Sequence, residues 1–261
     1  MKSVWSQSAV LICLSVFLAS CQSLPSRIPE SSKAYTELGL AYLEKKSYSL
    51  AETKLKHAIE LYERNAEAHH YLAELYRVQG RKLLARDEYE RAIALDRDNP
   101  SIWNNYAVFL CGIGEYEASE KWFLKAARKR GYEKRAEAYE NAGVCMLAAG
   151  NRDRAIRHFD NALGIELRER SLLQLATLEI DQGQADRAVE NLKRLHQFFK
   201  PSPESLYLLA RAEKDLGHSD QVEKIANQFQ ELFPDSPLNR KVHSLFESHS
   251  EQGNHSGQND R

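Results

Sequence analysis

Small and apolar residues recur along this chain at regular intervals, and within each interval they form two helical stripes. In the first stripe a small residue lies among large apolar ones, as at Gly39 and Ala73. In the second, small and large residues are spaced three or four apart, as at Ala51, Leu55 and Ala58. Residues with this spacing share one face of a helix. Each interval therefore predicts two amphipathic helices that bury their stripes against each other and against neighbouring units.

Six such units can be placed along the chain. Their first residues are Ser32, Ala66, Pro100, Ala136, Glu169 and Pro203, which are almost evenly spaced. The longest step holds an insertion around Gly131, and a glycine such as Gly80 recurs where the first helix must end, as expected for a left-handed C-terminal cap. Units 5 and 6 are the least regular, because Glu179 and Glu213 occupy the third aromatic position of the first helix.

The spacing of small and aromatic residues resembles the tetratricopeptide repeat (TPR), a helix-turn-helix unit of about 34 residues. The resemblance implies an all-α fold, a right-handed TPR superhelix of about six repeats over residues 32–235. Residues 236–247 are expected to form a capping helix, with Pro237 at its first position and Val242 and Leu245 in one apolar stripe. Residues 248–261 are polar and aperiodic, which predicts a disordered tail.

Residues 1–20 have the features of a targeting segment. Lys2 precedes an apolar run over residues 9–19, which is too short to cross a bilayer and has the length of a signal-peptide core. The run ends in Leu-Ala-Ser-Cys at residues 18–21, which resembles a bacterial lipobox. The resemblance implies that residues 1–20 are removed and that Cys21 carries several acyl chains, which together anchor a protein stably. The alternative is an ordinary cleaved signal peptide followed by a chance cysteine.

Residues 21–31 are expected to form a lipidated tether between the anchor and the first repeat. They are polar and contain Pro25 and Pro29, which is typical of an extended segment. Gln22 follows Cys21, and by resemblance to enterobacterial sorting the absence of Asp there favours transfer to the outer membrane. The sequence therefore predicts a protein that is lipid-anchored in the outer membrane and faces the periplasm.

Two cysteines remain in the predicted repeats. Cys111 and Cys145 are one repeat period apart, each near the end of the first helix of consecutive repeats. Stacked first helices place such positions side by side, and an oxidising periplasm favours a disulfide. The sequence predicts this bond. The alternative is two buried free thiols, since cysteine is often a core residue.

Composition and the absence of chemical motifs narrow the functional classes. The 261 residues are 43% hydrophobic and 28% charged with a net charge of -1, which provides enough apolar material for a helical core and no basic surplus for nucleic-acid binding. The sequence contains no HExxH metal motif, no G-x-S-x-G nucleophile elbow and no glycine-rich phosphate loop. We therefore expect no catalytic residues, metal, cofactor or small-molecule substrate, and a protein that binds other proteins rather than an enzyme.

The expected partner site is the concave surface of the first helices. In TPR proteins this surface carries positions 2, 5, 9, 12 and 13 of each repeat, and many of these positions are apolar here. The predicted groove of repeats 1 to 4 consists of Leu40, Leu43, Asn104, Val108, Val144 and Leu147, and Leu173, Ile180 and Tyr207 continue the row. An exposed apolar groove is typical of a partner site. The alternative is that supercoiling or a docked N-terminal segment buries these side chains.

One block of the sequence resembles a narrower family. Asn104-Asn105-Tyr106, Phe109-Leu110-Cys111, Gly131-Tyr132 and the stretch from Asn141 to Cys145 are similar to the central block of the PilF/PilW family of type IV pilus biogenesis lipoproteins. Members are outer-membrane pilotins that help to localise or multimerise the pilus secretin. The resemblance implies a pilotin that binds the secretin through its groove and the membrane lipid through Cys21. The alternative is a TPR lipoprotein adaptor for peptidoglycan hydrolases or outer-membrane assembly; an enzyme fits less well.

Overall fold

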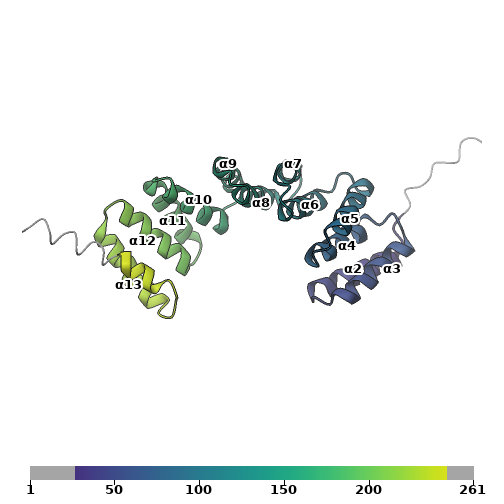
Figure 1. Ribbon diagram of the computed structural model, residues 1–261, viewed down its shortest axis with the longest axis horizontal. Coiled ribbons are helices and arrows are strands. Elements are labelled where there is room, and N and C mark those ends of the chain that lie inside the picture. The colour runs from purple at the N-terminus through teal and green to yellow at the C-terminus, as the bar shows by residue number, and fades with distance from the viewer. Residues whose placement is uncertain (1–26, 246–261) are drawn as a thin grey trace, which may run out of the picture. The chain divides into compact units, whose positions relative to one another are not determined.

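The structure, a computed structural model, describes residues 27–245 and within that range consists of helices joined by short turns, with no strand (Figure 1). The predicted signal peptide, Cys21, most of the tether, the last two residues of the expected cap and the tail lie outside the described residues. No described helix is both long enough and apolar enough to cross a membrane. The helices are α2 (Glu30–Glu44), α3 (Tyr48–Leu61), α4 (Ala66–Val78), α5 (Lys82–Leu95), α6 (Pro100–Gly112), α7 (Tyr116–Ala127), α8 (Arg135–Ala148), α9 (Arg152–Leu163), α10 (Glu169–Asp181), α11 (Ala185–Phe198), α12 (Pro203–Asp215) and α13 (Ser219–Leu232); residues 239–245 are also helical.

The first helix of each repeat begins where the sequence period places it. The helices α4, α6, α10 and α12 begin at Ala66, Pro100, Glu169 and Pro203, which are the predicted first residues, and α2 and α8 begin within two residues of theirs. The all-α TPR fold is thereby confirmed for the part of the chain that the structure describes.

Side-chain caps define several of these helix starts. Asn65, Asn99 and Asn151 precede α4, α6 and α9, and each side chain accepts a hydrogen bond from a backbone N–H group of the first turn. Ser202 and Ser205 form a capping box at the start of α12. Such caps satisfy N–H groups that have no partner inside the helix. Local sequence therefore helps to set where these helices begin.

The turn between the two helices of a repeat passes through the left-handed conformation. Gly80, between α4 and α5, has φ 72°, and a glycine with positive φ holds the same place in each later repeat. In the first repeat this place is held by Lys46, with φ 57°. A residue with a Cβ costs about 1 kcal/mol in this conformation. The stability of the turn therefore does not account for a lysine there.

The chain divides into two compact units, and the first comprises α2 to α5. Gly39 lets α2 and α3 approach closely, because a Cβ at this position would lie 2.5 Å from Leu55 Cγ. A buried polar cluster joins the first two repeats. Asn65 Nδ2 donates to Ser32 Oγ and to Thr36 Oγ1, each at 2.9 Å, and Ser32 Oγ donates to the carbonyl of Ala58 at 2.7 Å.

The second unit comprises α6 to α13 and the helical residues 239–245. One core cluster lies among α6 to α10 and contains the fully buried Phe159, which packs so closely on Gly143 that a Cβ there would lie 2.7 Å from its ring. A second cluster lies among α10 to α13 and contains Phe229 and Val242. Because Val242 comes from residues 239–245 and is fully buried, this segment covers the end of the core.

Two buried carboxylates account for the irregular pattern of repeats 5 and 6. Glu179 and Glu213 are 2% and 3% exposed. Glu179 accepts hydrogen bonds from Asn191 Nδ2 at 2.9 and 3.1 Å, and burial raises the pKa of Glu179. Glu213 pairs with Lys193 Nζ at 3.3 Å and with His218 Nδ1 at 2.7 Å. Buried polar groups need such partners, so these repeats replace an apolar contact by a polar one.

Candidate partner-binding surface on the first helices

Four of the six predicted groove residues lie in the second unit. Asn104 and Val108 come from α6, Val144 and Leu147 come from α8, and these two helices pack beside each other. The side chains of Val108, Val144 and Leu147 are partly buried and pack on the cluster that contains Phe159. Each therefore offers part of its apolar surface to a partner while the rest supports the core.

The other two predicted groove residues lie in the first unit. Leu40 and Leu43 are on α2, and both are half-buried. Of the residues that continue the predicted row, Leu173 and Tyr207 are partly buried against the second core cluster. Ile180 is only 4% exposed and belongs to that core, so its place in an accessible groove was wrong; it turns inward because its helix is covered by α11 and α12.

The side chain of Asn104 is more buried than a residue in an open groove would be. Its side chain is 4% exposed, and its Nδ2 donates to Asn105 Oδ1 at 3.3 Å. Its Oδ1 is buried and accepts no hydrogen bond from a described residue. A buried acceptor left without a donor costs free energy. The expectation of an exposed amide is therefore corrected to a buried amide with one open acceptor.

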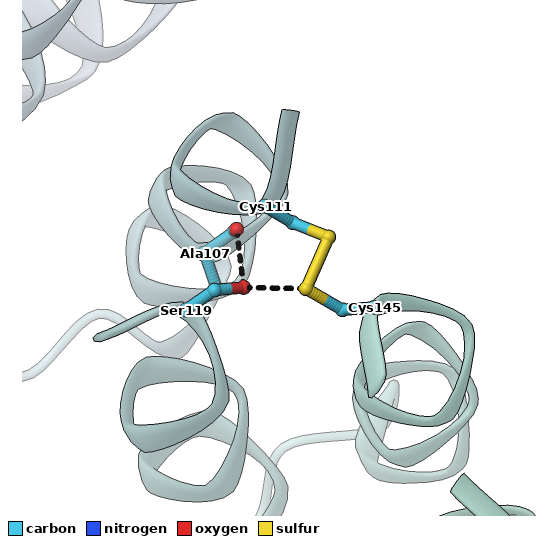
Figure 2. Close-up of a disulfide and its surroundings, with 4 residues drawn as sticks. All are labelled: Ala107, Cys111, Ser119 and Cys145. Atoms are coloured by element: carbon cyan, nitrogen blue, oxygen red, sulfur yellow. Dashed lines mark hydrogen bonds between the residues drawn. A yellow bond between two sulfur atoms is a disulfide. The ribbon is translucent and has the colours of Figure 1, made fainter. Parts of the chain in front are cut away.

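A disulfide joins the two helices that carry these side chains (Figure 2). The Cα atoms of Cys111 on α6 and Cys145 on α8 are 5.8 Å apart, within the range that a disulfide requires. Ser119 of α7 lies beside the bond: its Oγ donates to the carbonyl of Ala107 at 2.7 Å and is 3.3 Å from Cys145 Sγ. Helices α6, α7 and α8 meet here, and the disulfide links α6 covalently to α8.

A pocket of about 460 Å³ lies farther along the same unit. One wall is held by Glu140 of α8, whose carboxylate accepts from Ser171 Oγ at 2.8 Å and from the guanidinium of Arg168 at 3.1 Å. Since Glu140 is 4% exposed and has these partners, it acts as a rigid support. The residues that line the pocket are Glu140, Leu167, Arg168, Glu169, Arg170, Leu173, Gln174, Phe199 and Glu204.

The sequence patterns found part of this pocket. Leu173 was in the predicted row, but Glu140 and Arg168 were not. Glu140 lies one repeat after Asn104 once the insertion around Gly131 is included, so counting repeat positions would have found it. Arg168 lies in the loop before α10, and a repeat pattern carries no information on where a loop side chain points.

The electrostatics of the first helices differ between repeats. His70 of α4 corresponds in repeat position to Asn104 of α6. Its side chain is 6% exposed, and burial lowers the pKa of His70 to about 4, so it is neutral at neutral pH. Among the described residues no group of three or more His, Cys, Asp or Glu side chains is placed to hold a metal ion. The surface thus offers apolar area, fixed carboxylates and hydrogen-bonding groups.

Comparison with known proteins identifies the relatives of this fold. Tetratricopeptide-repeat models match residues 36–100 and 88–121. The type IV pilus assembly protein PilF of Pseudomonas aeruginosa is 27% identical over 239 residues, which cover 88% of this chain and 95% of PilF. The chain is a tetratricopeptide-repeat homologue of PilF.

Solved structures agree with this homology. A structure of Pseudomonas aeruginosa PilF matches with a TM-score of 0.69 at 27% identity, over 82% of this chain and 97% of that one. PilW, a widely conserved type IV pilus biogenesis factor, matches with a TM-score of 0.66 at 24% identity, over 81% and 97% of the two chains. The likeness to PilW shows the shared fold, and the homology to PilF extends along both units of this chain.

Proposed function

We propose that this PilF homologue is a lipoprotein scaffold of type IV pilus biogenesis, a pilotin that binds the pilus secretin and promotes its localisation and multimerisation. The observation that carries the proposal is the homology to PilF over 88% of this chain and 95% of the relative. A single shared repeat would imply only the fold, whereas this alignment covers most of both chains. Repeat arrays of this kind bind proteins on extended surfaces, which favours a scaffold over an enzyme.

The proposed position is the periplasmic side of the outer membrane. Cys21, which lies outside the described residues, would carry the acyl chains that hold the chain there. The basis is the lipobox-like sequence at residues 18–21 followed by Gln22. A protein anchored at this point keeps its repeats close to the membrane in which a secretin assembles.

We place the secretin segment on the surface of α6, α8 and α10. Val108, Val144 and Leu147 offer apolar contact, and the pocket of about 460 Å³ has room for a large side chain beside Leu173. Arg170 and Glu204 at the pocket rim supply charges of both signs. An apolar centre with a polar rim is the usual composition of a protein interface.

The test reverses one charge at the rim of the pocket. Arg170 is exposed, so Arg170→Glu is expected to leave the unfolding midpoint nearly unchanged, as for most surface substitutions. If the rim selects the secretin by charge, the variant loses roughly tenfold in affinity and forms fewer secretin multimers and surface pili. The measurements are a pull-down of the secretin, its multimers on an immunoblot and a count of pili. Arg194→Glu, an exposed residue of α11 that does not line the pocket, is the matched control.

Val108 and Leu147 need milder changes, because they support the core. Charged residues there would be buried against apolar neighbours and would unfold the chain, so Val108→Thr is the suitable replacement. Normal multimers and pili in Arg170→Glu and Val108→Thr would place the secretin on another surface. A deletion strain with normal secretin multimers and normal pili would reject the pilotin function itself, and would direct attention to hydrolase or assembly partners.

A further inference from the structure

One edge of the first unit has exposed leucines and lysines that the fold does not require. The edge is formed by the turns between α2 and α3 and between α4 and α5. We name it the Lys-Leu edge and define it as Lys45, Lys46, Leu50, Lys82, Leu83 and Leu84. Arg81, in the turn before α5, forms an ion pair with Glu52 of α3, with Arg81 NH1 3.1 Å from Glu52 Oε2, and so connects the two repeats near this edge. All six residues lie in the turn after α2 or among the first three residues of α3 and α5.

The leucines of this edge lie in solvent. Leu83 is 79% exposed, Leu50 is 48% exposed and Leu84 is 39% exposed. Leu50 and Leu84 stand at the same position of consecutive repeats, each directly before the buried alanine, Ala51 or Ala85, of the second helix. Single exposed apolar residues are common, but a group of them along one edge indicates a contact surface.

The other repeats show that packing does not demand leucine here. The position of Leu84 is occupied in repeats 3 to 6 by Ala118, Arg154, Arg187 and Gln221. The position of Leu83, in the first turn of the helix, holds an acid in these repeats: Glu117, Asp153, Asp186 and Asp220. An acid in the first turn is favourable because it faces the positive end of the helix dipole. Repeat 2 forgoes that contribution and exposes a leucine instead.

The lysines show the same departure from what the fold favours. Lys46 holds the left-handed position where the later repeats have glycine, although a Cβ is unfavourable there. Lys45, Lys46 and Lys82 all project from the turns, and each is exposed. Local strain that nothing in the packing explains is often associated with function.

We propose that the Lys-Leu edge rests on an anionic lipid leaflet, with its leucines among the acyl chains and its lysines at the headgroups. Apolar residues flanked by lysines are the composition that binds membrane surfaces. The edge projects outward, with Leu83 the most exposed of its leucines, which suits insertion into a layer better than a pocket for one side chain. The proposal rests on the proposed anchorage through Cys21 for its biological setting.

The distances along the chain allow both contacts at once. Helix α2 has 15 residues and is therefore about 22 Å long. The segment from Cys21 to Pro29 spans up to about 30 Å when extended. A segment of this length is sufficient for the far end of α2, where the Lys-Leu edge begins, to reach the membrane that would hold the lipid. A second contact of this kind would orient the first unit relative to the leaflet.

The experiment measures vesicle binding of the chain from residue 22 to 261, which lacks the acyl chains but keeps every described residue. Vesicles of phosphatidylethanolamine with phosphatidylglycerol are compared with vesicles of phosphatidylcholine in a flotation assay. We expect binding to the anionic vesicles, weakened by salt. The double variant Leu83→Glu with Leu84→Glu should bind at least tenfold more weakly, whereas Phe198→Glu, at a residue of α11 that is 67% exposed, should bind like the unchanged chain.

The variant Lys46→Gly distinguishes a role of Lys46 in membrane binding from a role in stabilising the fold. It should raise the thermal midpoint, because glycine relieves the left-handed strain, and at the same time lower anionic-vesicle binding about fivefold, since one lysine near an anionic surface contributes about that much. Circular dichroism confirms that each variant is folded, and Lys46→Gly still tests the edge if the leucine variant does not fold.

Two outcomes would overturn the proposal: no binding of the unchanged chain to anionic vesicles, or equal binding of the leucine variant. Normal vesicle binding of that variant with lost secretin multimers would instead make the edge a protein contact. Because the vesicles contain no secretin, a negative vesicle result does not contradict the proposed pilotin function. Conversely, loss of the pilotin proposal does not change the vesicle result.

Discussion

Polar residues buried near the start of a repeat help to specify how that repeat packs against its neighbour. Asn65 caps α4 and also donates hydrogen bonds to Ser32 and Thr36 of the preceding repeat. One side chain therefore fixes the start of α4 and its position against α2. Glu140 plays a comparable part for Arg168 and Ser171. These side chains favour one register, because a shifted neighbour would leave each of them buried without a partner.

Burial of His70 is expected to make the stability of the folded chain depend on pH. Its pKa is about 4 in the folded chain because burial disfavours the charged ring, whereas an exposed histidine has a pKa near 6.5. Between pH 6.5 and 4 the unfolded chain therefore binds a proton at this residue that the folded chain does not. Stability falls as the pH is lowered through this interval, and this one residue accounts for up to roughly 3 kcal/mol of the fall.

The measurement is urea unfolding of the unchanged chain and of His70→Gln between pH 7.5 and pH 4. The variant should be less stable at neutral pH, because the glutamine amide replaces a neutral imidazole in a buried site. Its stability should depend less steeply on pH below 6.5. Parallel curves for the two proteins would show that His70 is protonated equally in both states, contrary to the burial seen here.

At the scale of the helix, local sequence predicts beginnings and ends well. Pro100 and Pro203 at the first positions of α6 and α12, each after a capping residue, placed those helices correctly. Contacts between a loop and a distant helix were not predictable. Arg168 meets Glu140 from a loop in the following repeat, and the closed environment of Asn104 depends on its neighbours in three dimensions. The half-buried state of Val108 was likewise outside a pattern that distinguishes only faces of a helix.

The disulfide between α6 and α8 leads to a prediction at the same scale. It closes a loop with a sequence separation of 34, and restricting the unfolded chain by such a loop stabilises the folded state by about 3 to 4 kcal/mol, less any strain. Reduction of the unchanged protein should therefore lower the urea midpoint clearly. Peptide mapping without reductant should recover Cys111 linked to Cys145 in protein taken from the periplasm.

The double variant Cys111→Ala with Cys145→Ala is the control, and reductant should not change its midpoint. Two free thiols in protein recovered without reductant would contradict the bond. An unchanged midpoint after verified reduction would show instead that the packing of Ser119 and its neighbours holds α6 and α8 together without it.

For the whole molecule, the proposed anchor at Cys21 would decide where the repeats act. The lipobox-like residues 18–21 predict that Cys21→Ser prevents lipidation and maturation, since serine has no thiol to be acylated at this position. The variant should remain unprocessed in the inner membrane or be released, with fewer secretin multimers at the outer membrane. Membrane fractionation and labelling with a radioactive fatty acid measure this, with Cys111→Ala as a control that keeps the anchor. Outer-membrane fractionation of an unlabelled natural protein would exclude lipid anchorage.

The bond between Cys111 and Cys145 also has a mechanical consequence. A chain held by lipid at one end and pulled through a bound partner experiences force along its length, and helical repeats under such force extend one after another. The residues enclosed by the bond cannot extend, because the load passes through the two sulfur atoms. About 110 Å of contour length is therefore withheld from stretching, and α7 stays within a covalent loop even when the rest of its unit has been drawn out.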